Sequence, residues 1–437
     1  MNSNTRESKP GFSESPASPV RHQPTEARLS ETPGFARRAA LDLTMCWALL
    51  QGVVLLAGIG YGAHRLHEIQ QVRTPPKPKR EPLKIAPRYD RPDVVSDEQL
   101  VHVLTKLQPS FRGPNPKINH VDHALRFWGV EATFPDPNAY SGAELRDLLL
   151  DHRVFAKAWG DKTKPFLVPD TRGDDYYLAF RTKAGDATAS HVDHTLASLA
   201  EVGTPLDFPV NTPRGEMPLK ATFDQAFHEF SLNQEEYEWS TLVFLHYLPH
   251  VKAWFSTEGQ QITWELLADR LMRQRLAQGV CFGQHRLHAL ALLVKVDETH
   301  HLLSPAARDR IINHLKDATA RLSATQHADG YWDGKWPGAE RDGPATPPAN
   351  SLGDKADRLL ATGHILEWWA FAPPEALPSD ETLTRAAQWL VKELDTVTPE
   401  QMQRFYPFLT HAGRALAMWR SKWPQEVELK LQVDRDS

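Results

Sequence analysis

The chain has 437 residues, of which 41% are hydrophobic and 24% are charged, an ordinary balance for a protein with a buried core. The formal net charge is −5, and the basic residues gather before Asp93, so the rest of the chain is distinctly acidic. Because nucleic-acid-binding proteins normally carry a basic surface, we expect no nucleic-acid partner. The two cysteines are Cys46, which lies in an apolar run, and Cys281, so no disulfide framework is expected either.

The first segment, residues 1–38, is rich in Ser, Thr, Pro, Glu and Arg and has almost no periodic apolar pattern. Such a composition cannot bury enough apolar surface to offset the entropy that is lost on ordering. We therefore expect a disordered polar tail.

Residues 39–65 are expected to form a transmembrane helix. The stretch from Leu43 to Ala63 holds 21 residues without a charge, and at about 1.5 Å per helical residue it crosses a hydrocarbon core of roughly 30 Å. Trp47 and Tyr61 stand near its two ends, where aromatic rings prefer the membrane interface. A cleaved signal peptide has a short leading region, so the long polar tail argues against one. The lipid bilayer is thus the expected partner of this stretch, in a single pass.

Basic residues flank this span about equally on its two sides, so the positive-inside rule leaves the orientation open. We expect the tail inside and the large C-terminal domain outside the cytoplasm. Residues 66–92 contain "TPPKPKREPLKIAPRYDRP", a proline-rich basic linker that would act as a stiff spacer between bilayer and domain. Its basic side chains could also touch anionic lipid headgroups.

From residue 93 to residue 437 the dominant pattern is helical. "SDEQ" at Ser96 and "SGAE" at Ser141 are capping boxes ahead of apolar-periodic runs. Between residues 165 and 215 the pattern breaks down, and "DDYYLAFRTK" fits either a short strand pair or an irregular segment. Farther along, the periodicity predicts three helix pairs, 263–279 with 284–297, 305–325 with 352–371, and 380–395 with 399–419.

A long Gly- and Pro-rich loop, from Gln326 to Asn350, joins the middle pair. Leu322, Gln326, Gly330 and Trp332 have the spacing L-x3-Q-x3-G-x-W, which resembles the Q-W repeat of squalene cyclases and related prenyltransferase-type α/α toroids. The resemblance covers about residues 260–420. It implies an all-α domain in which inner and outer helices alternate around an incomplete or irregular ring. The chain holds one good copy of the repeat and no D-x-D-D acid motif, and the zinc set of the protein prenyltransferases does not match.

Two interpretations of this loop remain open. In the one we favour, the amide of Gln326 and the ring of Trp332 staple a helix end to its neighbour, while Gly330 permits a left-handed turn. In the other, the loop is the lip of an active site. Substrate would then be bound by Trp332 and by three further residues, Trp368, Asp329 and Asp333.

Histidines recur on three helices that would be of the same kind if inner and outer helices alternate. They are His285 and His288 on the first, His364 on the second and His411 on the third, and Glu367 lies one turn after His364. Polar groups that converge from several helices line a cavity, so our catalytic candidates are His288, His364, Glu367 and His411. The competing interpretation is that they are hydrogen-bonded core residues.

"CFGQHRLH" places Cys281, His285 and His288 at i, i+4 and i+7, on one face if the segment is helical. These side chains could hold zinc, but the set lacks the fourth ligand that zinc sites normally gather, and we expect no metal or other cofactor. Cys281 as a nucleophile beside His285 is also disfavoured, because that helical spacing seldom orients a thiolate toward a substrate.

Three functions follow. We favour a membrane-anchored binding or scaffold domain for a protein or polysaccharide ligand. The alternatives are a glycan-processing enzyme, a lyase or hydrolase that uses histidines and carboxylates of the cavity, and an isoprenoid cyclase or transferase. A centre rich in tryptophan, histidine and carboxylates would favour the glycan enzyme, and a centre filled with aliphatic side chains would favour the scaffold.

Overall fold

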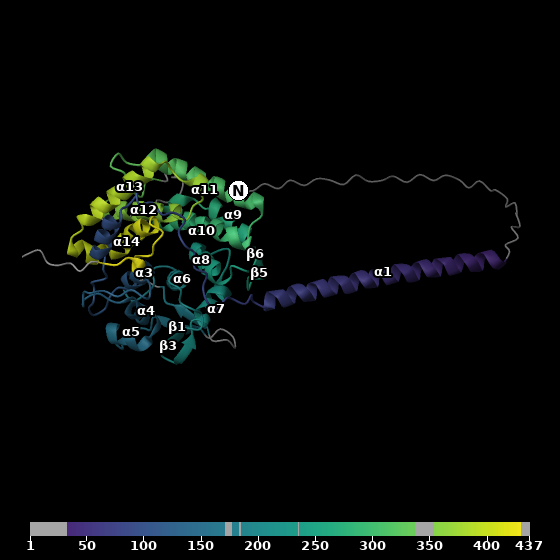
Figure 1. Cartoon of the computed structure of the whole chain (residues 1–437). Coiled ribbons are helices and arrows are strands. Elements are labelled where there is room, and N and C mark those ends of the chain that lie inside the picture. Colours follow the sequence, from purple (N-terminus) through teal and green to yellow (C-terminus); the bar gives the residue numbers. More distant parts are fainter. Residues whose placement is uncertain (1–32, 171–176, 183–184, 235, 337–353, 430–437) are drawn as a thin grey trace, which may run out of the picture. The chain divides into compact units, whose positions relative to one another are not determined.

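The computed structural model describes residues 33–170, 177–182, 185–234, 236–336 and 354–429. The chain separates into two compact units, Met1–Glu68 and Ile69–Ser437 (Figure 1). Residues 1–32 of the expected tail lie outside the described residues. The end of that tail was predicted wrongly, because residues 33–38 already belong to helix α1, Pro33–Arg73.

Helix α1 contains a segment that is long and apolar enough to cross a membrane. That segment, Leu41–His67, has 27 residues, and none of its apolar window is buried inside the structure. Its large side chains are open, with Leu56 at 70% exposed. The helix also runs on past the expected boundary at residue 65 and ends at Arg73.

Residues 74–92 form a strap across the folded domain. This corrects the prediction that the segment is a free spacer. The amide nitrogens of Leu83 and Arg88 donate to the carbonyls of His246 and Ala370. Tyr89 stacks on Trp419 with 5.2 Å between ring centroids. These contacts lie at the carboxyl ends of the inner helices described next. The proline-rich sequence keeps the strap extended, and its backbone bonds to those ends instead of to water.

Within the described part of the chain, six helices form a closed cycle, because each contacts the next and the last contacts the first. Every residue of α8 (Tyr237–Tyr247), the third helix of the cycle, is buried. Such burial is typical of a helix that is surrounded by others. The six inner helices are α3 (Ile118–Trp128), α6 (His194–Glu201), α8 (Tyr237–Tyr247), α10 (Gln284–His300), α12 (Asp354–Trp369) and α14 (Pro399–Met418).

A second set of helices lies against this cycle and buries one face only. Ser96 and Ser141 cap two of them with capping boxes, as their sequences predict. Figure 1 shows α11 and α13 along one side of α10, α12 and α14. The outer helices are α2 (Asp97–Lys106), α4 (Gly142–Leu150), α5 (His152–Trp159), α7 (Lys220–Glu229), α9 (Trp264–Arg273), α11 (Pro305–Thr325) and α13 (Asp380–Asp395).

The connections also carry short strands, so the domain is mostly helical and not purely so. Each strand pair is an antiparallel hairpin of two strands. Of the segment left undecided in the sequence, Tyr177–Phe180 forms the second strand of the first hairpin, in which Leu167 is opposite Phe180. The pairs are β1 (Leu167–Asp170) with β2 (Tyr177–Phe180), β3 (Pro209–Thr212) with β4 (Gly215–Pro218), and β5 (Ala253–Phe255) with β6 (Gln261–Thr263).

Candidate functional site

The inner helices bring their polar side chains together in the middle of the cycle. These residues, with the half-buried Cys281 and the buried Trp239 of α8 beside them, are called the central cluster below. Its members on α3, α6, α10, α12 and α14 are His123, Arg126, His194, Glu201, His285, His288, His364, Glu367, His411 and Arg414.

Glu367 is the hub of the cluster and is only 2% exposed. Its Oε2 accepts hydrogen bonds from Nδ1 of His364 at 2.9 Å and from Nδ1 of His411 at 3.0 Å. Its Oε1 accepts one from Nη1 of Arg414 at 3.0 Å. Because both imidazoles donate through Nδ1, their neutral forms carry the lone pair on Nε2. Both rings therefore present an acceptor nitrogen to their surroundings.

Two arginines and two glutamates balance their charges here. Glu201 Oε2 lies 2.5 Å from Nε of Arg126 and 3.1 Å from Nη2 of Arg414. Arg414 thereby joins Glu201 to Glu367. His288 reaches the network from α10, with its Nε2 3.8 Å from Oε1 of Glu201. The four predicted catalytic residues thus belong to one buried network. His364, Glu367 and His411 are in direct contact, and His288 joins the network through Glu201.

Burial and charge fix the protonation states. Burial opposes ionisation of Glu367, but His411 and its other polar neighbours outweigh it and hold the pKa of this carboxyl well below its ordinary value. The two arginines hold the pKa of Glu201 low in the same way. Burial lowers the pKa of His411 to about 3 and also lowers the pKa of His364. At neutral pH the centre therefore contains ionised carboxylates and neutral imidazoles.

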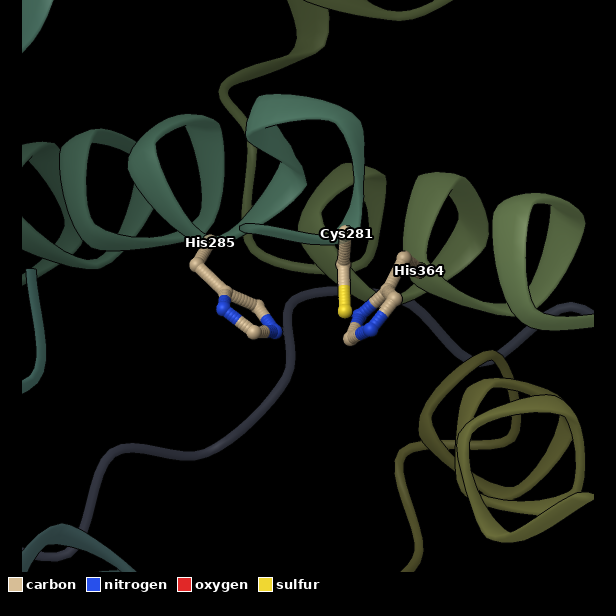
Figure 2. A group of neighbouring side chains, drawn as sticks. All are labelled: Cys281, His285 and His364. Carbon is tan, nitrogen blue, oxygen red and sulfur yellow. The ribbon is translucent and has the colours of Figure 1, made fainter. Parts of the chain in front are cut away.

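On the other side of His364 lie His285 and Cys281, whose side chains point into the same space (Figure 2). One ligand atom from each of the three lies within 4.8 Å of the others. Cys281 is not on a helical face with His285 and His288, as the sequence had suggested. It lies in the 3-10 turn η2, Val280–Gly283, with a φ of 49°. The third member of the set is thus His364 and not His288.

Several residues of the site were not anticipated. Arg126, Glu201 and Arg414 supply the charges, and His123 and His194 extend the row of imidazoles. The ring of His123 is 5.3 Å from that of His411 and 4.9 Å from that of His194. A usable signal was present, because charged residues interrupt the otherwise apolar "HALRFW", "TLASLAE" and "AGRALAMW".

Pockets lie at opposite ends of the cluster. The larger, about 490 Å³, is lined by Asn119 and His120 at the start of α3 and by Arg404 in the first half of α14. Its Asn119 accepts a hydrogen bond from Nδ1 of His123 through the backbone carbonyl. The smaller, about 130 Å³, lies under the strap and reaches Arg126, Glu201 and Arg414. The smaller pocket is therefore lined by residues of the central cluster, whereas the larger one reaches Asn119, one turn of α3 before His123.

The residues predicted to bind substrate lie apart from this centre. Trp332 is fully buried and donates through Nε1 to the carbonyl of Leu322 at 2.8 Å. Trp368 donates to Oε1 of Gln284 at 2.8 Å and is also fully buried. Asp329 is exposed, and Asp333 accepts from the amide of Lys335 in its own loop.

The Q-W segment has the geometry of a staple. Nε2 of Gln326 donates to the carbonyls of Gly330 and Thr382, both at 2.9 Å, and Thr382 belongs to the first turn of α13. Gly330 has a φ of 105°, and a Cβ there would meet the carbonyl oxygen of Arg385 at 2.5 Å. The segment therefore ties the end of α11 to α13. The rest of the long loop, residues 337–350, lies outside the described residues.

No protein-family model, curated protein or solved structure matches this chain.

Proposed function

We propose that the folded domain is an α/α toroid and that it is a lyase which cleaves uronate-containing glycans at the central cluster. Helix α1 anchors it in a membrane, with the domain outside the cytoplasm. The closed cycle of inner helices and the surrounding outer helices support the toroid, as does the stapled Q-W segment. The length and apolar composition of Leu41–His67 support the anchor.

The single observation that carries the enzymatic proposal is Glu367 between two neutral imidazoles. Of these, His411 is our candidate base, because Nδ1 is engaged by the carboxylate and Nε2 remains an acceptor. When Nε2 takes up a proton, the adjacent carboxylate offsets part of the cost that burial imposes on the imidazolium, the role that a carboxylate has in catalytic triads. Glu367 and His364 are positioning residues in this proposal.

The charges favour elimination over hydrolysis. Glycoside hydrolysis needs a carboxylic acid that stays protonated, whereas both carboxyls of the central cluster, Glu367 and Glu201, have pKa values well below the ordinary value. In elimination, a base removes the proton next to the uronate carboxylate, the neighbouring C–O bond breaks, a C=C bond forms and the leaving oxygen takes a proton. Arg414, whose Nε has no hydrogen-bond partner among the described residues, can neutralise the uronate carboxylate.

The surroundings favour a polar substrate. The buried Trp239 lies beside His285, with 4.5 Å between ring centroids, and adds an aromatic wall to the cluster. The larger pocket has Lys117 and Arg404 on its walls against one acidic residue, Asp186, and this excess of positive charge favours an anionic chain. An isoprenoid cyclase would need an apolar lining instead, and a pure scaffold would have an aliphatic centre. The composition of the cluster thus supports the glycan enzyme over both.

The test uses the full chain in detergent with four uronate-containing polymers: alginate, polygalacturonate, hyaluronan and heparin. Elimination leaves an unsaturated uronate, which is followed by its ultraviolet absorbance. His411→Asn keeps a donor toward Glu367 and removes the Nε2 acceptor, so we expect turnover to fall by about 100- to 10,000-fold.

The matched control is His102→Asn. His102 also faces a carboxylate, with Nε2 2.7 Å from Asp395, but this pair is on the surface. We expect unchanged turnover in the control. If the wild-type chain forms no unsaturated product from any of the four polymers, the lyase proposal is wrong. If His411→Asn keeps full turnover, His411 is not the base.

A further inference from the structure

The side chains at the amino end of α10 offer nitrogen and sulfur ligands to a common point. Cys281 comes from η2, His285 from the first turn of α10 and His364 from α12 (Figure 2). Their nearest ligand atoms lie within 4.8 Å of one another. A tetrahedral zinc ion has bonds of about 2.0–2.3 Å to such atoms, which separates neighbouring ligands by about 3.4–3.8 Å. Small side-chain rotations bring the three ligands to that spacing.

The two histidines have unpartnered nitrogens at this point. His285 is 6% exposed, and neither of its ring nitrogens has a hydrogen-bond partner among the described residues. His364 is 3% exposed, and its Nε2 also lacks such a partner. A buried polar atom without a partner is unfavourable, because it has lost its hydrogen bonds to water. A ring directs only one of its two nitrogens to a given place, so one nitrogen of His285 and Nε2 of His364 are available to a common ligand.

His364 is already oriented as a metal ligand would be. Its Nδ1–H donates to Glu367 at 2.9 Å, which fixes the tautomer and leaves Nε2 as a buried acceptor without a hydrogen-bond partner among the described residues. A carboxylate behind a ligating histidine is the usual outer shell of zinc sites. Arg414 in turn holds the other oxygen of Glu367, so this carboxylate is itself fixed.

The backbone presents Cys281 in an unusual way. Cys281 and Phe282 both adopt the left-handed conformation, with φ values of 49° and 60°, and Gly283 follows with a φ of 75°. A non-glycine residue is strained in this region and persists only where the surroundings impose it. Here the turn directs the thiol toward α12. The ring of Phe282 lies against Gly334 of the stapled segment, where a Cβ would be 2.3 Å from the ring.

From this geometry we propose a mononuclear zinc(II) site formed by Sγ of Cys281, one ring nitrogen of His285 and Nε2 of His364. Three protein ligands leave the fourth position open to substrate, the arrangement of catalytic rather than structural zinc. The site deepens the proposed function, because it lies beside His411, whose ring is 3.7 Å from that of His364. At that place a zinc ion would polarise a carboxylate oxygen of the bound uronate.

Metal binding is tested on the full chain in detergent, without reference to activity. The protein is stripped with a chelator and titrated with Zn²⁺ or Co²⁺, and bound metal is measured by elemental analysis. We expect one ion per chain, and with Co²⁺ a sulfur-to-cobalt charge-transfer band that requires Cys281. Cys281→Ser should abolish the band and weaken binding by more than the 10- to 100-fold typical of outer-shell changes. Cys46→Ser is the matched control and should bind like the wild type.

Far-UV circular dichroism checks that each variant is folded. His285→Gln is a second ligand variant, and we expect it to bind metal more weakly while the charge-transfer band persists at reduced intensity. An undiminished band in Cys281→Ser, or metal uptake no greater than background in the wild type, overturns the site. Stoichiometric copper in place of zinc overturns the choice of metal. Zinc binding without cleavage of any of the four polymers would support the zinc site and refute the lyase proposal. Cleavage by metal-free protein would support the lyase proposal and refute a catalytic role for zinc.

Discussion

At the residue scale, the stapled segment and the central cluster use similar residue types for different purposes. Trp332 is fully buried with its Nε1 satisfied by Leu322, so its ring contributes packing and a helix-end bond. His285 is equally buried, but its two nitrogens have no hydrogen-bond partner among the described residues. The difference separates a structural residue, whose polar atoms are satisfied inside the fold, from a candidate ligand, whose polar atoms are not.

A first prediction concerns Trp332. Trp332→Ala removes a large buried side chain that also lies against Trp369, and we expect a loss of about 3–5 kcal/mol in the free energy of unfolding. That is a large share of the roughly 5–15 kcal/mol by which a domain is stable. Asp329→Asn and Asp333→Asn are the matched controls in the same segment, and both should melt like the wild type. A melting temperature that Trp332→Ala leaves unchanged would refute the staple.

At the element scale, the strap corrects the expectation of a free spacer. Ile85 is 7% exposed against the domain. Arg88 donates to the carbonyl of Phe371 at 2.6 Å and pairs with Glu298 at 2.7 Å. Asp90 pairs with Arg420, at 2.8 Å. These contacts join the ends of α10, α12 and α14, so the strap belongs to the domain although its sequence is typical of a linker.

A second prediction compares two truncations. A fragment that begins at residue 74 keeps the strap, whereas one that begins at Asp93 loses it and exposes the surfaces beneath Ile85 and Tyr89. We expect the shorter fragment to be less stable by at least about 2 kcal/mol, which is the burial of one aliphatic side chain alone. Urea titrations followed by circular dichroism measure the difference. Equal midpoints would show that the strap contributes nothing to stability.

At the scale of the whole molecule, the buried histidines make stability depend on pH. His246 is an example outside the proposed metal site: burial lowers its pKa below the ordinary 6.5, and its Nδ1 bonds to the carbonyl of Leu83. Above pH 6.5 both the folded and the unfolded states hold it neutral, and its contribution to stability is fully present. Below pH 6.5 only the unfolded state takes up the proton, so stability falls as the pH is lowered.

A third prediction follows from this fall of stability at low pH. Each such histidine should make the free energy of unfolding fall by up to about 1.4 kcal/mol per pH unit below pH 6.5. His246→Asn keeps a donor at the position of Nδ1 and removes the titration, so it should flatten the slope by that amount. The exposed His102→Asn should leave the slope unchanged. Urea unfolding at a series of pH values from 7.5 down to about 5 measures it. A slope that His246→Asn does not alter would contradict the prediction.

The sequence by itself determined the helices of the last part of the chain and the apolar span. Caps at Ser304 and Thr398 and the apolar periodicity predict α10 to α14 to within a few residues, because both are local along the chain. The exception is the predicted 263–279 helix, which ends at Arg273, since the Gly-rich turns η1 (Leu276–Gln278) and η2 follow.

Only the tertiary structure decided which charged residues of the central cluster pair with one another. Arg126 meets Glu201 across 75 residues of sequence, and Arg414 meets the same carboxylate across 213. No local pattern records which inner helix faces which, because that follows from closing the cycle between α14 and α3. The left-handed turn at Cys281 is imposed in the same way, by packing around Gly283 and Phe282. The histidines could therefore be singled out from the sequence, but their partners and their unpartnered nitrogens depend on contacts between distant segments.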